Sequence, residues 1–183
     1  MLTILEDGGM VEVATIGREG MVGVTAAWTE SPVPFVVMGQ AESDACYRMT
    51  VEAFRREMDR RGAFYDLLSR YSQALLGCVM QSTACNAVHS IEQRLARWLL
   101  LAQDRVGTLD LQLTQEFVAM MLGATRPTVT LVAGTLQKAG LIKYHHGRVS
   151  IKDREGLEEA SCECYRTANL LLKSVTDGAP RSR

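Results

Sequence analysis

The spacing of apolar and polar positions divides the chain into a β-rich beginning and a long helical remainder. Residues 11–16 alternate between apolar and polar side chains, which predicts a strand, and residues 35–38, after Pro34, predict another. Residues 6–9 carry the Asp-Gly-Gly signature of a turn. We therefore expect about four short strands in residues 1–50.

A helical period replaces this alternation from residue 50 onward. Thr50 is a candidate N-cap for a short helix over residues 50–58. After Gly62, one set of side chains recurs at alternating steps of three and four, which is the spacing of a seam that packs against another helix. We favour homodimerisation along this seam, with burial within a single chain as the alternative. The seam consists of Leu68, Tyr71, Leu75, Cys78, Ser82, Cys85 and His89.

Two more helices are predicted, one before and one after residues 113–142. Ser90 and Gln93 form a capping-box signature at the start of a helix over residues 89–103. The last helix is expected over about residues 155–174, and residues 177–183 have the composition of a disordered tail.

Residues 113–142 predict two helices joined by a tight turn at Gly123. Such a pair is the form in which many proteins present a helix to the DNA major groove. Residues 141–151 then predict a hairpin with a basic and imidazole-bearing tip, so the whole unit reads as a winged helix-turn-helix. The apolar positions of the second helix, expected in the core, are Val129, Leu131, Val132 and Leu136.

Arg126, early in the second helix, is the first candidate for reading a base. An arginine there can donate to both O6 and N7 of guanine. Pro127 suits the first helical turn, where its missing N–H costs little. The neighbouring threonines could contact phosphates and thymine methyl groups, or could simply cap the helices. The DNA-binding candidates are Thr114, Gln115, Thr125, Arg126, Pro127, Thr128, Thr130, Lys143, His145, His146 and Arg148.

Charge is distributed unevenly along the chain, although the net charge is only −1. Residues 1–50 hold two basic and seven acidic side chains, whereas residues 112–154 hold six basic and two acidic ones. A positive region beside a negative one would direct a polyanion to the former. Ordinary variation of surface charge is the alternative.

Composition restricts the class of protein. The chain is 47% hydrophobic and 22% charged, with no apolar run long enough for a membrane span and no secretory signal at its start. Its five cysteines are odd in number and lack CxxC spacing, which favours reduced thiols. We expect a cytoplasmic protein.

Enzymatic and metal chemistry find little support in the sequence. No nucleophile–base pair, phosphate-binding loop or paired carboxylates stand out. Cys162 and Cys164 lack a third and a fourth ligand nearby in the sequence. Cys78 and Cys85 are seven residues apart, which is the spacing of packing positions on one helical face. His145 and His146 are adjacent on a predicted strand, where neighbouring side chains point in opposite directions. We predict no enzyme, no cofactor and no metal site.

Five short motifs follow one another through the second half of the chain: QRLARWLL at residues 93–100, LTQE at 113–116, LGATRPTV at 122–129, LQKAGLI beginning at Leu136, and CECY at 162–165. Together they closely resemble the C-terminal half of Crp/Fnr-type transcriptional regulators, over about residues 86–170. Residues 16–23 are similar to the later part of that family's cyclic-nucleotide-binding-like β-roll, and the long helix takes the place of its dimerisation helix.

The β-roll segment departs from the family pattern. Cyclic-AMP-binding members have a glutamate after the first glycine of a Gly-Glu-Leu-Gly motif and a later Arg-Ser pair, whereas this chain has Gly20-Met-Val-Gly23 and, later, Pro34-Phe35. We therefore do not expect cyclic-nucleotide binding. The roll is also shorter than in the family, which indicates either an N-terminally incomplete chain or a degenerate member.

The predicted fold class is α+β, with a partial β-roll, a long dimerisation helix and a C-terminal winged helix-turn-helix. The expected divisions are 1–50, 51–85, 86–156 and 157–183. The resemblance implies a homodimeric regulator that binds an inverted repeat in double-stranded DNA, with RNA polymerase as a candidate partner. The alternative is an interaction or sensing module that does not bind DNA.

Overall fold

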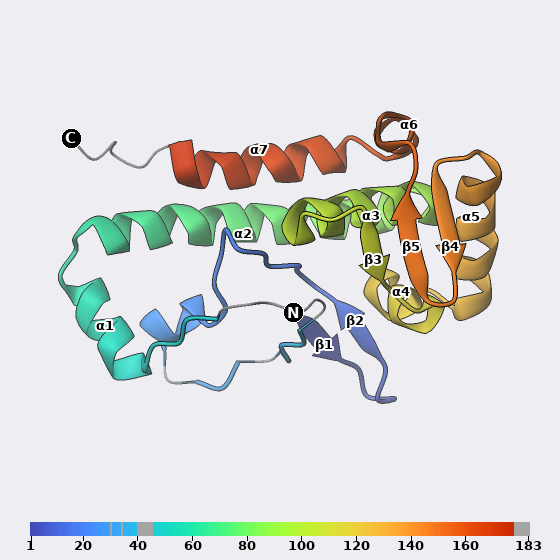
Figure 1. The fold of residues 1–183 in the computed structure, drawn as a ribbon. Coiled ribbons are helices and arrows are strands. Elements are labelled where there is room, and N and C mark those ends of the chain that lie inside the picture. The colour runs from blue at the N-terminus through green and yellow to red at the C-terminus, as the bar shows by residue number, and fades with distance from the viewer. Residues whose placement is uncertain (30, 34, 40–45, 178–183) are drawn as a thin grey trace.

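The computed structural model describes residues 1–29, 31–33, 35–39 and 46–177, and its fold is α+β, as predicted (Figure 1). Two small sheets accompany a set of helices dominated by one long helix. The strands are β1 (Leu2–Ile4), β2 (Met10–Glu12), β3 (Asp110–Gln112), β4 (Ile142–His145) and β5 (Arg148–Ile151). The helices are the 3₁₀ turn η1 (Val24–Ala27), α1 (Val51–Asp59), α2 (Ala63–Val88), α3 (Ile91–Val106), α4 (Gln115–Leu122), α5 (Arg126–Lys138), α6 (Arg154–Ala160) and α7 (Cys164–Asp177).

The N-terminal segment has less sheet than the sequence predicts. Strands β1 and β2 form an antiparallel hairpin around the expected turn, and Val36 adds a single bridge to Leu2. Beyond Glu12, the backbone amides of Val13 and Ala14 both donate to the Met1 carbonyl, at 3.0 and 3.5 Å. The strand predicted after Pro34 is reduced to the one bridge at Val36, and Pro34 itself lies outside the described residues.

Helices α2 and α7 lie side by side and run antiparallel (Figure 1). Helix α1 precedes them, with Thr50 accepting a hydrogen bond from the Ala53 amide as the predicted N-cap. Gly77 permits the close approach of the two long helices, because a Cβ there would lie 3.1 Å from Leu171 Cδ1. The long helix is therefore packed along one side by the chain's own C-terminal helix.

This packing corrects the preferred interpretation of the α2 seam. Leu68 and Tyr71 are buried with Val24, Phe54 and Val175 inside the chain, and Leu75 packs against the same cluster. Further along the seam, Cys78 Sγ lies 4.0 Å from the Ala168 carbonyl oxygen of α7. Ser82 accepts a hydrogen bond from Arg97 of α3. Cys85 is fully buried and lies against Cys162. The alternative of burial within one chain is the correct one, because α7 and the N-terminal segment supply the apolar partner that we had assigned to a second subunit.

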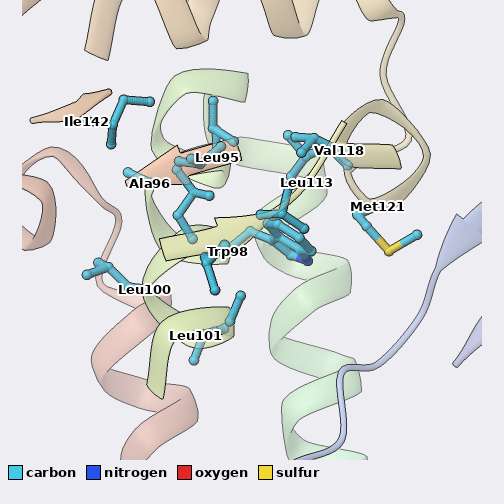
Figure 2. Packing of buried hydrophobic residues seen from close by; sticks show 14 of the residues in the cluster. Leu95, Ala96, Trp98, Leu100, Leu101, Leu113, Val118, Met121 and Ile142 are labelled. Carbon is cyan, nitrogen blue, oxygen red and sulfur yellow. The ribbon is translucent and has the colours of Figure 1, made fainter. Parts of the chain in front are cut away.

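The main core is built around α3, which begins with the predicted capping box between Ser90 and Gln93. Leu95, Leu99 and Leu100 are almost completely buried. Figure 2 shows Trp98 of this helix close to Leu113 and Val118, at the level where α4 begins. Trp98 Nε1 donates to Glu12 Oε1 at 3.1 Å, which ties the N-terminal hairpin to the core.

The C-terminal elements surround a three-stranded antiparallel sheet with the order β3-β5-β4. The single last helix predicted over residues 155–174 is in fact two helices, α6 and α7, with a break at residues 161–163. The backbone N–H of Ser161 donates to the carbonyls of Leu157 and Glu158, which closes α6 just before the Cys162–Cys164 segment. Residues 178–183 of the predicted tail lie outside the described residues.

Within the described part of the chain, no single helix combines the length and apolar content of a membrane span. Helices α4 and α5 meet that test only when taken together, and the chain bends by 103° between them.

Candidate nucleic-acid interface

Helices α4 and α5 form a helix-turn-helix with well-defined ends. Thr114 caps α4 by accepting from the Phe117 amide, and Thr125 caps α5 by accepting from the Thr128 amide. Gly123 ends α4 with φ of 57°, a left-handed conformation that glycine adopts without strain. The 103° bend between the helices is within the range of about 90–120° found in helix-turn-helix pairs.

Arg126 stands at the exposed start of α5, where the helix dipole is positive. Its side chain is 66% exposed, and its Nη1 lies 3.8 Å from the Glu116 carboxylate of α4. This distance and exposure make a weak ion pair that an incoming phosphate or base edge can displace. Arg126 is therefore available to a ligand in front of α5.

The predicted threonines are joined by hydrogen bonds across this surface. Thr130 Oγ1 donates to Gln115 Oε1 at 2.7 Å, which links the two helices, and the hydroxyls of Thr125 and Thr128 lie 2.9 Å apart. Pro127 occupies the first turn of α5, as predicted. The Thr130–Gln115 hydrogen bond thus ties α5 to α4 at this surface.

Strands β4 and β5 form the predicted wing. His146 and Gly147 form its two-residue turn with φ of 46° and 75°, the positive values that a tight hairpin turn requires. The expectation that His145 and His146 point apart is wrong, because the positive φ of His146 takes it out of the strand conformation. Their ring centroids are only 3.8 Å apart.

Tyr144 fastens the wing to the helix-turn-helix. Its amide donates to Gln137 Oε1 at 2.7 Å, and its hydroxyl donates to the Leu113 carbonyl at 2.7 Å. Burial raises the pKa of the Tyr144 phenol to about 12, so this hydroxyl stays a donor across the physiological range. The sequence alone gave no sign of this role, because it depends on the contact between β4 and the segment before α4.

A shared hollow brings four predicted residues together with Tyr144 and Gly147. Thr114, Gln115, Arg126 and His146 line it from α4, α5 and the wing. Lys143 and Arg148 are exposed on the wing outside this hollow. The interface therefore combines a hollow with flanking basic side chains.

One expected core position of α5 is exposed. Val129 and Leu136 are buried and Val132 packs against the main core, but Leu131 is 72% exposed. Leu131 lies one helical turn beyond Pro127, whereas the core is contacted by the opposite face of α5. Its side chain is thus part of the open surface.

A second cluster of polar side chains lies away from this interface. Cys85, His89, Cys162 and Cys164 each place one potential ligand atom within 4.8 Å of the others. Our expectation that Cys162 and Cys164 lack further ligands is wrong, because α2 brings Cys85 and His89 to them from more than seventy residues away in the sequence.

Comparison with known proteins adds an independent line of support. Residues 93–160 match the model of the Crp-like helix-turn-helix domain. The transcriptional regulator SdrP of Thermus thermophilus is 33% identical over 79 residues, which are 40% of this chain and 39% of SdrP. Among solved structures, the CRP-family regulator TTHB099, also of Thermus thermophilus, superposes with a TM-score of 0.60 at 22% identity, over 87% of this chain and 81% of that one.

Residues 93–160 of the chain are thus similar to the Crp-like helix-turn-helix domain. A putative transcriptional regulator of the Crp/Fnr family from Eubacterium rectale has a TM-score of 0.50 at 25% identity, and the match covers 60% of this chain and 51% of that protein. The matched regions thus span about half or less of the length of these two relatives, SdrP and the Eubacterium rectale protein. The Crp-like domain match extends to residue 160, which is the last residue of α6.

Proposed function

We propose that this protein is a sequence-specific, double-stranded-DNA-binding transcription regulator of Crp/Fnr type. The observation that carries the proposal is the hollow lined by Thr114, Gln115, Arg126 and His146, which joins both helices of the helix-turn-helix to the wing. The similarity of residues 93–160 to the Crp-like domain supports the same function.

In this proposal, α5 enters the major groove and Arg126 donates to O6 and N7 of a guanine. Thr128 and the exposed Leu131 face the same groove, where an apolar side chain can contact a thymine methyl group. Lys143, His145 and Arg148 of the wing contact the phosphate backbone, which positions the protein without reading sequence.

Thr114, Gln115, Thr125 and Thr130 hold the edges of the helix pair against the DNA backbone. Thr114 and Thr125 accept from backbone amides, and Gln115 accepts from Thr130 through its Oε1. The Thr114 hydroxyl and the Gln115 side-chain N–H groups are therefore the donors for a phosphate oxygen, whereas the Thr130 hydroxyl already donates within the protein. Pro127 begins α5 without presenting an unsatisfied N–H to the DNA. RNA polymerase is a candidate partner of the assembled complex.

We further propose that two copies of the chain bind an inverted repeat as a dimer. The two copies would contact each other through a face of α2 that differs from the one first expected. On the side of α2 away from α7, Leu76, Met80, Thr83 and Ala87 are exposed and recur at steps of four, three and four. This is the spacing of a coiled-coil seam. Two α5 helices held by such a seam would read half-sites about one helical turn, or ~34 Å, apart.

Binding-site selection from randomised duplexes tests the DNA-reading proposal. The wild-type protein should select an inverted repeat, and its affinity should fall steeply with salt. Arg126→Ala should relax the choice at one guanine of each half-site by about 1–3 kcal/mol, or roughly 5- to 150-fold. Arg60→Ala, which removes a similarly exposed arginine at the C-cap of α1, is the control. An unchanged motif in Arg126→Ala contradicts the assigned role, and the absence of any selected motif favours a module that does not bind DNA.

The oligomeric state tests the dimer face. Leu76→Asp should shift the protein from dimer to monomer in sedimentation velocity, because it places a charge in the proposed seam. Leu170→Asp on α7 is a matched control, since the two leucines are 60% and 61% exposed. Equal behaviour of the two variants contradicts this face of α2 as the interface.

A further inference from the structure

Four side chains with metal-binding chemistry meet where α2 ends and where α6 gives way to α7. Cys85 lies in the last turn of α2, and His89, the C-cap residue of that helix, follows it by four positions on the same face. Cys162 comes from the break between α6 and α7, and Cys164 is the first residue of α7. Three of the four side chains are buried, and their ligand atoms all lie within 4.8 Å of one another.

The separations suit one small ion with four ligands. Cys85 Sγ and Cys162 Sγ are 3.5 Å apart, and Cys164 Sγ and His89 Nδ1 are 3.6 Å apart. With Zn–S of about 2.3 Å and Zn–N of about 2.0 Å, the edges of a tetrahedral site are roughly 3.5–3.8 Å long. An iron–sulfur cluster would need ligands spread around several iron atoms, so this compact set fits a single ion better.

The groups around the cluster also have the arrangement of a metal site. His89 turns Nδ1 toward Cys164, while its Nε2 lies 3.3 Å from the Glu163 carboxylate. A metal-binding histidine commonly donates its second ring N–H to a carboxylate in this way, which orients the ring and fixes its tautomer. Gln81 Nε2 donates to Cys164 Sγ at 3.0 Å, a contact that stabilises a thiolate.

Two buried arginines lie beside the thiols. Arg94 and Arg97 of α3 are both buried, and each carries an Nε that has no hydrogen-bond partner within the described residues. Both interact electrostatically with Cys85. Three thiolates, one neutral imidazole and a divalent ion carry a net charge of −1, and such a site would compensate part of this buried positive charge.

We propose that Cys85, His89, Cys162 and Cys164 bind one Zn²⁺ ion in a tetrahedral Cys₃His site. Each cysteine releases its proton to solvent as its sulfur binds the metal. The ion fastens the end of α2 to the α6–α7 junction and therefore fixes the helix-turn-helix domain relative to the long helix. This site goes beyond the proposed DNA-binding function and does not depend on it.

The metal content of the full-length protein tests the proposal. Protein purified without chelators should contain about one zinc ion per chain, as measured by elemental mass spectrometry. The metal-free protein should bind Co²⁺ with the visible absorption bands of tetrahedral thiolate coordination. Cys164→Ser should lose most of the zinc, whereas Cys78→Ser, a cysteine outside the cluster, should retain it. Metal content no higher in wild-type protein than in Cys164→Ser overturns the proposal.

Glu163→Gln provides a second test that leaves all four ligands in place. The Glu163 side chain is 65% exposed, so its replacement should not disturb folding. Loss of this partner of His89 should weaken zinc binding by about 10- to 100-fold in a competition titration with a chromophoric chelator. Glu159→Gln, an exposed glutamate on α6, is the matched control. Equal zinc affinity of the two variants overturns the assigned role of Glu163.

The alternative to metal binding is oxidation of the cysteines in this cluster to a disulfide. A disulfide between Cys85 and Cys162 in the freshly purified protein, detected by alkylation and mass spectrometry without bound zinc, overturns the metal assignment. Free thiols that become protected from alkylation only after zinc is added support it.

Discussion

The two ends of this molecule are packed very differently. In residues 91–151, Leu99, Val118, Val129 and Leu136 are each almost completely buried. The described part of residues 1–39 instead exposes Ile4, Leu5, Trp28 and Val37, and the sheet described there consists of one hairpin and one bridge. The C-terminal region thus has a core of its own, whereas the N-terminal region is divided: Leu2 packs into that core, and Val24 packs into a separate cluster with residues of α1, α2 and α7.

A few specific contacts join the two regions. Leu2 is buried within the main core, and Met10 packs against it. Glu12 accepts a hydrogen bond from Trp98, and a Cβ on Gly123, at the turn of the helix-turn-helix, would lie 3.3 Å from Val11 Cγ1. The β1–β2 hairpin therefore packs against the helix-turn-helix, close to the turn between α4 and α5.

The largest expected effect is a difference between the two regions in how much a substitution lowers the free energy of unfolding. Leu99→Ala removes a core side chain that is 1% exposed, and it should lower the free energy of unfolding by about 2–5 kcal/mol. Val37→Ala, at a position that is 54% exposed, should change it by less than about 0.5 kcal/mol. Urea denaturation followed by circular dichroism measures both, and comparable losses would remove the contrast between the regions.

A smaller effect should appear at the contact between them. Glu12→Ala leaves the buried Trp98 N–H without its acceptor, which should cost about 1–3 kcal/mol. The intrinsic fluorescence of Trp98 should change at the same time. Glu6→Ala, in the exposed turn of the same hairpin, controls for the loss of a negative charge. If the two variants unfold at the same urea concentration, the contact contributes nothing to the docking of the hairpin.

Within the C-terminal region, Tyr144→Phe should loosen the wing. The variant removes the hydroxyl that donates to the Leu113 carbonyl and should lower stability by about 1 kcal/mol. Hydrogen exchange should accelerate in β4 and β5 while the amides of α3 remain protected. Unchanged exchange in the wing would show that the Gln137 contact alone is sufficient to hold it.

The smallest effect concerns alkaline pH. Burial raises the pKa of Tyr144 from its ordinary value of 10 to about 12, so the folded protein holds this proton more tightly than the unfolded chain does. The resulting stabilisation is fully present below pH 10 and is lost as the pH rises toward 12. Wild-type stability should fall toward that of Tyr144→Phe over this interval, as measured by urea denaturation at several pH values. Parallel profiles for the two proteins would contradict this titration.

The helix-turn-helix and its wing were largely predictable because their parts are close together in the sequence. Thr114, Gly123 and Thr125 have local roles as caps and turn, and each role follows from the residue type and its neighbours. The exposure of Leu131 and the role of Tyr144 were missed, because both depend on which face of α5 and which side of β4 meet the remainder of the fold.

The α2 seam shows where periodicity stops being informative. Its three-and-four spacing correctly predicted a long helix with an apolar side to be covered, but the same spacing fits an intramolecular or an intermolecular partner equally well. Helix α7, nearly a hundred residues later in the chain, packs on the seam face, beside Gly77. The opposite face, with Leu76 and Met80, is the one left exposed.

The sequence by itself determined the helix-turn-helix, the wing, the capping residues and the long helix, because each depends on backbone preferences and side-chain periods over fewer than about twenty residues. Only the tertiary structure decided which face of α2 is covered and that Cys85 and His89 meet Cys162 and Cys164. Such contacts join segments that are far apart along the chain, and the spacing of residues within one segment carries no information about which distant segment will pack against it.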